Sequence, residues 1–565
     1  MSDFKIAAVF SNHMVLQRNK YTAIFGEASD KAIIKASLFD DKGDLLSTNS
    51  TIAEKGSWLL ELEPQSAQTG CTLKVTDDNT EIIFSDIAIG EVWLAGGQSN
   101  MEFELQNCKE GPDELKDEKA GKNVRFYYTN KIGWKDDKFF EAERQTSWQT
   151  WESPSRGAWS AVGYFFAKQL AEDLDCTVGL IGCNWGGTSA SAWMRREYLE
   201  RDLDLNTYLT DYAEATRGKS IEQQCKEFDD YEIENAKWQE KFGKLWEKQP
   251  GITWAEAEKI LGKNPWPGPA SCKNPYRPCG LYDCMVSRIL PYTLEGVIWY
   301  QGESDDHKPA SYFKLFSALI DNWRTDWNDN SLPFVFVQLP VHRYEADPDF
   351  KHWPLIREAQ AKVHNTIKNA WLTNAFDLGQ YSDIHPVAKK VLALRMEKNA
   401  LANVYNLLPS IDAAAPQIEG CHQIFDENKN GQLVLTFSNA PLGFEIRDDE
   451  VRLEEYKKME EIQGNTVSPD FTGFEICEKD GIWKPAEFAL GGTDGKQNLI
   501  ILKNKELNHP IAARYGWYNY GPVTVYGKNG LPLCPFRISA SGTACSQAGK
   551  SDETGHAKIQ QIMTV

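Results

Sequence analysis

The chain lacks the features of a membrane-spanning, nucleic-acid-binding or exported protein. No stretch of its 565 residues approaches the roughly 18 consecutive apolar residues that a membrane span needs. The formal charge of −20 at pH 7 argues against a nucleic-acid partner, because phosphate binding requires a basic face. Residues 1–6 show no charged leader followed by a long apolar core. We therefore expect a soluble protein with no membrane and no nucleic-acid partner, cytoplasmic as the sequence stands, and periplasmic or secreted if a leader has been removed.

Closely spaced cysteine pairs are also missing. The 12 cysteines are irregularly placed, and no Cys-x-x-Cys occurs among them. The tightest group is Cys272, Cys279 and Cys284, for which a zinc site would need a fourth ligand. We interpret these residues as free thiols or one loop disulfide, and we expect no metal.

The most informative segment present is an apolar run that stops at Gly96 and Gly97 and is followed by Ser99. A strand ending in two glycines can turn sharply and leave the Ser99 hydroxyl at the carboxyl edge of a sheet, where α/β enzymes place their nucleophiles. Far downstream, Asp383 and His385 are two residues apart. A carboxylate at this spacing can hold Nδ1 of the imidazole while Nε2 faces a nucleophile.

Two more segments share the form of a strand followed by glycine. The first ends in Gly186-Gly187-Thr188, where backbone N–H groups can point at an anion. The second ends in Gln301-Gly-Glu303, which offers an amide and a carboxylate. Each taken alone is also compatible with a plain turn between a strand and a helix.

The order and spacing of these four segments resemble a sialate O-acetylesterase-type carbohydrate acetylesterase of the SGNH hydrolase superfamily. The resemblance spans residues from about 6 to 537 and implies no organic cofactor. It implies Ser99 as nucleophile, His385 as general base, and a carboxylate that orients His385. Asp383 and Glu303 both remain candidates for that carboxylate, and we favour Asp383 because its spacing constrains it to lie beside His385.

The resemblance further implies an oxyanion hole formed by the N–H groups of Ser99 and Gly187 and by the side chain of Gln301. The wider superfamily has an Asn in the third block, and Gln301 offers an equivalent amide donor. We expect further contacts to substrate from four residues near these blocks: Gln98, Asn100, Trp185 and Trp193.

These residues predict a serine esterase that removes O-acetyl groups from sugars, above all from O-acetylated sialic acid, through an acetyl-enzyme. An acetylxylan or other polysaccharide acetylesterase is the alternative within the enzyme class, since the oxyanion machinery does not distinguish the leaving alcohol. A glycan-binding protein without turnover is the alternative outside that class. Such a protein has no use for Ser, Gln, Asp and His at separate strand ends.

Hydrophobic periodicity predicts an α/β fold with β-rich ends. Residues 1–88 show short apolar stretches between turns, typical of a β-sandwich-like domain. Residues 89–408 alternate strands with helices, which predicts an SGNH-like, mostly parallel sheet flanked by helices, with a helical insertion at 195–278. Within it, we expect an amphipathic helix over 312–323 and a closing helix over 386–406. Residues 409–540 predict a second β-sandwich-like domain, and 541–565 a flexible tail.

Overall fold

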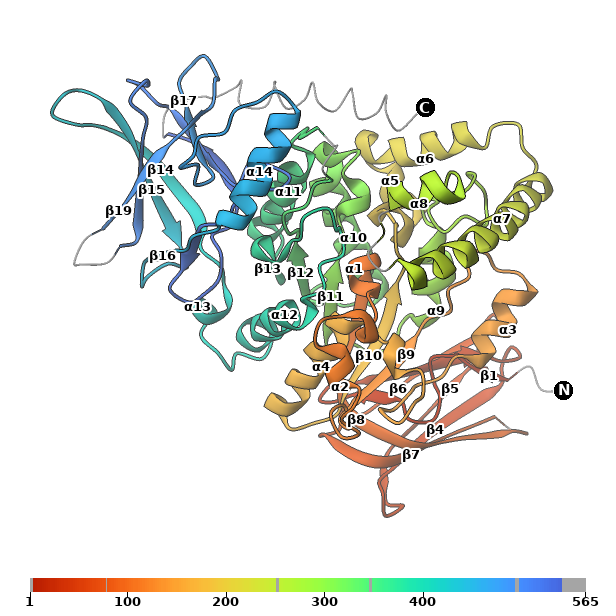
Figure 1. The fold of residues 1–565 in the computed structure, drawn as a ribbon. Helices are drawn as coiled ribbons and strands as arrows, with labels where there is room; N and C mark the ends of the chain where they lie inside the picture. Colours follow the sequence, from red (N-terminus) through yellow and green to blue (C-terminus); the bar gives the residue numbers. More distant parts are fainter. Residues whose placement is uncertain are drawn as a thin grey trace.

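The computed structural model describes residues 4–77, 79–249, 252, 254–344, 348–492 and 497–540, so the expected tail at 541–565 lies outside the described residues. The chain forms a mixed α/β structure with several sheets (Figure 1). A central sheet with helices on its faces connects an N-terminal group of strands to a C-terminal β-rich part. Among the described helices, none has the length and apolarity that crossing a membrane demands.

Most of the N-terminal strands form two antiparallel groups, whereas β2 pairs in parallel with β8. One sheet has the order β1-β3-β6, and β5, β4 and β7 follow one another toward β8 in the other. In β6, buried Trp58, Leu60 and Leu62 alternate with exposed residues, as expected for a strand with one face on the core. The strands are β1 (Lys5–Ile6), β2 (Val15–Gln17), β3 (Thr22–Glu27), β4 (Ile33–Phe39), β5 (Leu45–Ile52), β6 (Ser57–Leu62), β7 (Gln68–Thr76) and β8 (Glu81–Gly97).

Strand β8 joins the N-terminal and central sheets without a break. It is 17 residues long; its first part pairs antiparallel with β7, and its last part lies parallel to β10 and β11. Residues 81–86 are mostly exposed or half-buried, whereas every residue of 87–97 is buried. The boundary expected at residue 88 therefore falls inside one strand, at the point where its surroundings change from a half-exposed to a fully buried sheet.

The central sheet is parallel throughout and has the order β9-β10-β8-β11-β12-β13. Its strands are almost continuously buried, as expected when helices cover both faces. The further strands are β9 (Val124–Tyr128), β10 (Val178–Asn184), β11 (Gly296–Tyr300), β12 (Phe334–Gln338) and β13 (Ala370–Asn374). The associated helices are α1 (Ser99–Glu102), α2 (Gly111–Glu114), α3 (Asp137–Gln145), α4 (Ala161–Leu174), α9 (Ser287–Ile289), α10 (Tyr312–Asp326), α11 (His352–Thr366) and α12 (Lys389–Asn403).

A helical excursion interrupts the central part between β10 and β11. It consists of α5 (Arg196–Glu200), α6 (Leu203–Ala215), α7 (Ile221–Lys248) and α8 (Trp254–Leu261). Figure 1 shows these yellow and yellow-green helices on the side of the central sheet away from the C-terminal strands. These four helices and an irregular segment that follows them lie in the range 195–278, where we expect a helical insertion.

The C-terminal part has its own hydrophobic core. Its larger sheets have the orders β14-β15-β20-β19 and β18-β17-β21-β23. The charged helix α14 (Glu450–Ile462) lies within a region for which the sequence pattern predicted only strands. The other elements are α13 (Ser410–Ala413), β14 (Gln417–Phe425), β15 (Gly431–Ser438), β16 (Phe444–Ile446), β17 (Phe474–Cys477), β18 (Lys484–Pro485), β19 (Glu487–Gly491), β20 (Leu499–Lys503), β21 (Ala512–Tyr515), β22 (Val525–Gly527) and β23 (Phe536–Ser539).

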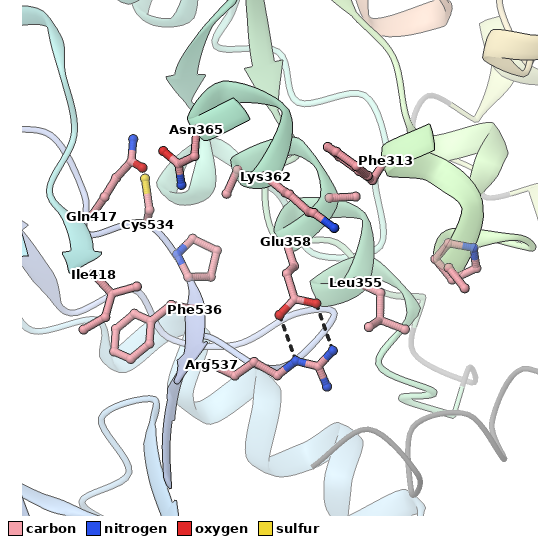
Figure 2. A pocket seen from close by; sticks show the side chains of 15 residues that line it. Phe313, Leu355, Glu358, Lys362, Asn365, Gln417, Ile418, Cys534, Phe536 and Arg537 are labelled. Atoms are coloured by element: carbon pink, nitrogen blue, oxygen red, sulfur yellow. Dashed lines mark hydrogen bonds and ion pairs between the residues drawn. The ribbon is translucent and has the colours of Figure 1, made fainter. Parts of the chain in front are cut away.

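The C-terminal part is fastened to α11 by two arginines. Arg357 is fully buried and donates hydrogen bonds to the carbonyls of Tyr518 and Asn519, each at 2.9 Å. Arg537 makes a two-pronged ion pair with Glu358, at 2.8 and 2.9 Å, beside a cavity of about 630 Å³ between α10, α11 and the C-terminal strands (Figure 2). Neither Ser99 nor His385 lines this cavity.

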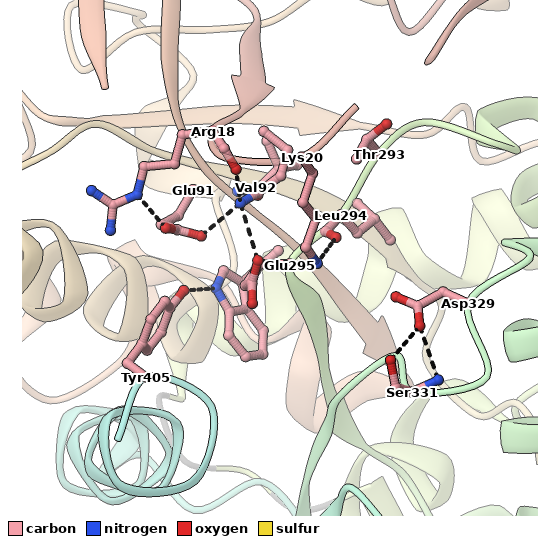
Figure 3. A network of polar contacts seen from close by, with 12 residues as sticks. Arg18, Lys20, Glu91, Val92, Thr293, Leu294, Glu295, Asp329, Ser331 and Tyr405 are labelled. Carbon is pink, nitrogen blue, oxygen red and sulfur yellow. Dashed lines mark hydrogen bonds and ion pairs between the residues drawn. The ribbon is translucent and has the colours of Figure 1, made fainter. Parts of the chain in front are cut away.

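A polar network lies at the N-terminal end of the parallel strands, opposite the carboxyl end where Ser99 lies (Figure 3). Glu91 accepts hydrogen bonds from Arg18 at 2.5 Å and from Gln17 at 2.9 Å. Gln17 also donates to Glu295, which lies 3.0 Å from the ammonium of Lys20. Burial raises the pKa of Glu295. These contacts hold β8 and β11 side by side at one end. They thereby fix how far the two strands are shifted along one another, and so the relative positions of Ser99 and Gln301 beyond their other ends.

Candidate active site

Ser99 lies directly beyond the carboxyl end of β8 and begins the short helix α1. Gly97 makes this turn with φ = 135°, a conformation that side chains rarely adopt. A Cβ atom at Gly97 would also lie 2.1 Å from the carbonyl oxygen of Tyr300 on β11. Glycine is therefore required both for the turn and for the close approach of the two strands.

His385 reaches Ser99 from the loop between β13 and α12. Its Nε2 lies 2.8 Å from Oγ of Ser99, within hydrogen-bond distance. Burial, and then the nearby ammonium of Lys389, lower the pKa of His385 below its ordinary value. The imidazole is therefore neutral at pH 7 and able to accept the Ser99 proton.

Asp383 lies beside His385 but bonds to its backbone. Oδ1 of this exposed carboxylate accepts a hydrogen bond from the backbone N–H of His385 at 2.8 Å. Within the described ranges, no acceptor is paired with Nδ1 of His385. The structure thus places Asp383 next to the imidazole, with its carboxylate bonded to the main chain rather than to Nδ1 as the spacing predicted.

Glu303 is bonded to Asn100 rather than to the imidazole. Nδ2 of Asn100 donates to Oε1 of Glu303 at 2.6 Å and to the carbonyl of Ile384 at 2.9 Å. Oδ1 of Asn100 accepts from Nζ of Lys389 at 2.5 Å. Asn100 therefore connects the helix that carries Ser99 to the loop that carries His385 and to α12.

The groups around Asn100 are buried and chargeable. Burial raises the pKa of the Glu303 carboxyl to about 7 and lowers the pKa of the Lys389 ammonium to about 7. Oε2 of Glu303 is buried and has no hydrogen-bond partner among the described residues. Removing either charge leaves the other buried beside Asn100, and such a change is costly in a protein interior.

The Gly186-Gly187 turn packs directly against the nucleophile. A Cβ at Gly186 would lie 3.2 Å from Cβ of Ser99, and the Gly186 N–H donates to Oε2 of Glu102 at 2.6 Å. Gly187 has φ = 74°. Across the described part of the chain, the N–H groups of Ser99 and Gly187 have no acceptor. Both are therefore available to a ligand.

The expected role of the Gln301 side chain does not fit the structure. Its Nε2 donates to Oδ2 of Asp305 at 2.6 Å and to the carbonyl of Thr188 at 3.2 Å, while its Oε1 accepts from Tyr312 at 2.9 Å. Both amide hydrogens are used, because acceptors from distant segments converge on this fully buried side chain. Gln301 thus supports the Thr188 turn and has no hydrogen left for an oxyanion.

Three of the four expected substrate contacts are also corrected, because Trp193, Asn100 and Gln98 are buried. Trp193 is fully buried and donates from Nε1 to Oγ1 of Thr188 at 3.0 Å, so it belongs to the core. Asn100 is 1% exposed and bonded as described above. Gln98 is 2% exposed and accepts from the backbone N–H of Ser304. Trp185 is half-buried.

Sequence reasoning missed three residues of this site. Glu102 holds the Gly186 turn and pairs with Lys131 at 2.5 Å. Lys389 is the buried lysine whose ammonium bonds to Asn100. His342 is buried near His385, and burial lowers its pKa to about 4. Glu102 comes three residues after Ser99 and Lys389 four after His385, so their spacing to the motif residues is the available signal. His342 has no such signal.

The chain is similar to known carbohydrate esterases. A family model described as carbohydrate esterase, sialic acid-specific acetylesterase, matches residues 270–400, which include Glu303, Asp383 and His385. The mouse sialate O-acetylesterase is 25% identical over 94% of each chain, and the human one 25% identical over 71% of each. The crystal structure of a carbohydrate acetylesterase from Xanthomonas citri has a TM-score of 0.68, with 23% identity over 95% of this chain and 99% of that one.

Proposed function

We propose that this chain, a carbohydrate esterase of the sialate O-acetylesterase type, removes O-acetyl groups from sugars, above all from O-acetylated sialic acid, through an acetyl-Ser99 intermediate. The observation that carries the mechanism is the 2.8 Å contact between Nε2 of His385 and Oγ of Ser99 at the carboxyl edge of a parallel sheet. A nucleophile hydroxyl paired with a neutral imidazole is the minimal unit of serine acyl transfer.

In the first half of the reaction, His385 takes the Ser99 proton on Nε2 as Oγ attacks the acetyl carbonyl carbon. The tetrahedral intermediate then breaks its bond to the sugar oxygen, which leaves with the proton returned by His385. In the second half, His385 takes a proton from water as the water oxygen attacks the acetyl group, and it returns this proton to Oγ of Ser99 as Oγ leaves. The acetic acid that is released ionises to acetate. His385 alternates between base and acid, for which its lowered pKa keeps the neutral form available.

Asp383 is the carboxylate that we assign to the orientation of His385. Its Oδ1 already caps the His385 backbone N–H, and its negative charge favours the imidazolium that forms during the reaction. We propose that the exposed Asp383 side chain rotates so that one of its carboxylate oxygens reaches Nδ1. Glu303, in contrast, is fixed by its 2.6 Å bond from Asn100. Glu303 and Asn100 are therefore positioning residues.

The oxyanion is assigned to the backbone N–H groups of Ser99 and Gly187. Each such donor typically contributes about 2.7–4 kcal/mol to transition-state stabilisation. Gln301 acts indirectly, through Asp305. Its side-chain amide donates a hydrogen bond to Asp305, and Asp305 in turn accepts one from Oγ of Ser189 at 2.6 Å. This network sets the shape of the turn that presents the Gly187 N–H.

The parallel order of the central strands and the position of Ser99 at their carboxyl edge support an SGNH-hydrolase-like catalytic part. We extend this proposal to the domain plan of residues 1–88, 89–408 and 409–540, with β-sandwich-like parts at both ends. The first two parts share the continuous strand β8, which runs across the boundary between them.

A polysaccharide acetylesterase, acting for example on acetylxylan, is the second candidate. The sialic acid carboxylate calls for a cationic partner, and three arginines near the motifs are engaged elsewhere. Arg357 is buried on backbone carbonyls, Arg195 pairs with Asp326 at 3.0 Å, and Arg196 pairs with Glu200 at 2.7 Å. Their engagement leaves these three arginines unavailable to a sialic acid carboxylate, and this observation keeps a neutral sugar as the second candidate for the acetyl carrier.

The test measures acetate release from p-nitrophenyl acetate, O-acetylated sialic acid and acetylated xylan. The wild-type protein is compared with Ser99→Ala and with Ser155→Ala, a control at an exposed serine. We expect release that is lost in Ser99→Ala and unchanged in Ser155→Ala, and the preferred natural substrate separates the two enzyme candidates. Release that persists in Ser99→Ala contradicts the nucleophile assignment. Binding of these glycans without any release identifies a glycan-binding protein.

A further inference from the structure

Two cysteines of the helical excursion lie within reach of one another. Cys225 lies in α7, and Cys272 lies in the irregular segment that leads back to the central sheet. Their Sγ atoms are 3.5 Å apart, although 47 positions separate the residues in sequence. Cys272 is buried and Cys225 is half-buried, so solvent reaches the pair from the Cys225 side.

The backbone around Cys272 is already held against α7. The Cys272 N–H donates to Oε1 of Gln224 at 3.0 Å, and Oγ of Ser271 donates to the Gln224 carbonyl at 2.9 Å. Lys273 pairs with Asp229, one helical turn after Cys225, at 2.6 Å. These bonds keep the two sulfurs facing one another. A disulfide has an S–S distance of about 2.05 Å, so closure needs a movement of only about 1.5 Å.

The same segment contacts the Gly186-Gly187 turn. A Cβ at Gly187 would lie 3.1 Å from the ring atoms of both Trp266 and Tyr276. The Trp266 indole N–H donates to the Tyr276 hydroxyl at 2.8 Å, so the two rings form one unit over the turn. The Cys272 carbonyl accepts a hydrogen bond from Nε of Arg277 at 2.7 Å. Arg277 follows Tyr276 in the chain, so this bond connects Cys272 to the two rings.

We propose that Cys225 and Cys272 form a redox-sensitive disulfide that fixes the segment 264–277, with Trp266 and Tyr276, over the Gly187 turn. The proposal holds whether or not Ser99 is the nucleophile. The oxidant is a small disulfide. The Cys225 thiolate attacks one sulfur of the oxidant and releases a thiolate, and the Cys272 thiolate then displaces the second thiolate from Sγ of Cys225. The pair loses two protons and two electrons, and the oxidant becomes two thiols.

Thiol counting and disulfide mapping test the bond. The 565-residue chain, carrying Cys545→Ser so that this cysteine cannot contribute a thiol, is reduced and then treated with oxidised glutathione. We expect the loss of two free thiols and a cross-linked peptide pair that contains residues 225 and 272. Cys225→Ser removes this loss, and Cys284→Ser, a change at another buried cysteine, preserves it. Thiol loss that persists in Cys225→Ser, or a stable glutathione adduct on Cys225 without the cross-link, overturns the proposal.

Hydrogen exchange tests the restraint separately. Peptides that cover residues 264–277 are expected to exchange more slowly in the oxidised than in the reduced protein, and the Cys225→Ser variant is expected to show no such difference. A cross-link that forms without slowing the exchange of these peptides overturns the restraint on the segment.

Discussion

Nε2 of His385 lies 2.8 Å from Oγ of Ser99, although 286 positions separate the two residues in the chain. Asn100 fixes the loop that carries His385, because its side chain donates a hydrogen bond to the carbonyl of Ile384, the residue before His385. The residue that follows Ser99 in α1 thus holds the loop that brings the base to Ser99. The contact depends on this connection as well as on the two residues themselves.

The pH dependence of turnover is expected to depend on Lys389. Burial, and then the Lys389 ammonium, lower the pKa of His385, so the neutral base persists below the ordinary histidine pKa of about 6.5. Lys389→Met removes this cation, which raises the pKa of His385 and moves the acid limb of kcat/KM to higher pH. The measurement is the pH profile of acetate release.

The adjacent Lys390 provides the control for this change. Lys390→Met leaves the acid limb in place, because the Lys390 ammonium lies over the Phe165 ring and is not among the charges that shift His385. An acid limb that stays in place in Lys389→Met, or that moves to lower pH, contradicts the electrostatic role of Lys389.

The two carboxylates near the base are expected to differ in importance. Asp383→Ala is expected to lower kcat by about 10²-fold to 10⁴-fold, because the imidazolium loses its neighbouring charge. Glu303→Ala is expected to keep more activity, since its carboxylate bonds to Asn100 and not to His385. Steady-state kinetics of the two variants, compared side by side, give the ranking, and the reverse ranking would assign the orienting role to Glu303.

The variant Asp383→Asn distinguishes two roles of Asp383: the negative charge beside the imidazole, and the hydrogen bond to the backbone N–H of His385. The amide oxygen of Asn can still accept the His385 N–H bond, so a large loss in this variant identifies the carboxylate charge as the important property. Activity close to wild type would mean that capping the loop is the main role of Asp383.

Asn100 is expected to affect kcat more than KM. Asn100→Ala frees the Ile384 carbonyl and the Glu303 carboxyl together, and a base displaced by about 1 Å can cost about 10²-fold in rate. Substrate affinity is preserved because Asn100 is buried below the nucleophile. The kinetic split is measured against Asn130→Ala, which removes an amide bonded to the Phe139 carbonyl. A rise in KM with kcat unchanged would place Asn100 in substrate contact.

Gly97→Ala is expected to destabilise the fold far more than Gly43→Ala. Both glycines have positive φ, which costs about 1–2 kcal/mol for a residue with a side chain. A Cβ at Gly43 meets nothing within 4 Å, whereas a Cβ at Gly97 would lie 2.1 Å from the Tyr300 carbonyl oxygen. Thermal denaturation and soluble yield measure the difference. Equal effects of the two changes would mean that β8 and β11 can separate at this point.

The family resemblance carried by the four motifs is confirmed by the comparisons with sialate O-acetylesterases. Local pattern also predicted particular elements. The expected helix over 312–323 corresponds to α10, and the strand that ends at two glycines corresponds to the end of β8. Such elements follow from sequence because periodicity and glycine act on the backbone within a few residues.

The sequence by itself determined which chemical groups are present and which strands they follow: a serine after a glycine turn, an amide directly before a glycine, and a carboxylate two residues from a histidine. Only the tertiary structure decided their partners. Gln301 is bonded to Asp305 and Thr188, and Asn100 to Glu303 and Lys389, because a buried polar group takes the nearest donors and acceptors, whichever segments supply them. Those segments are brought together by packing over long sequence separations, and no local pattern encodes that competition.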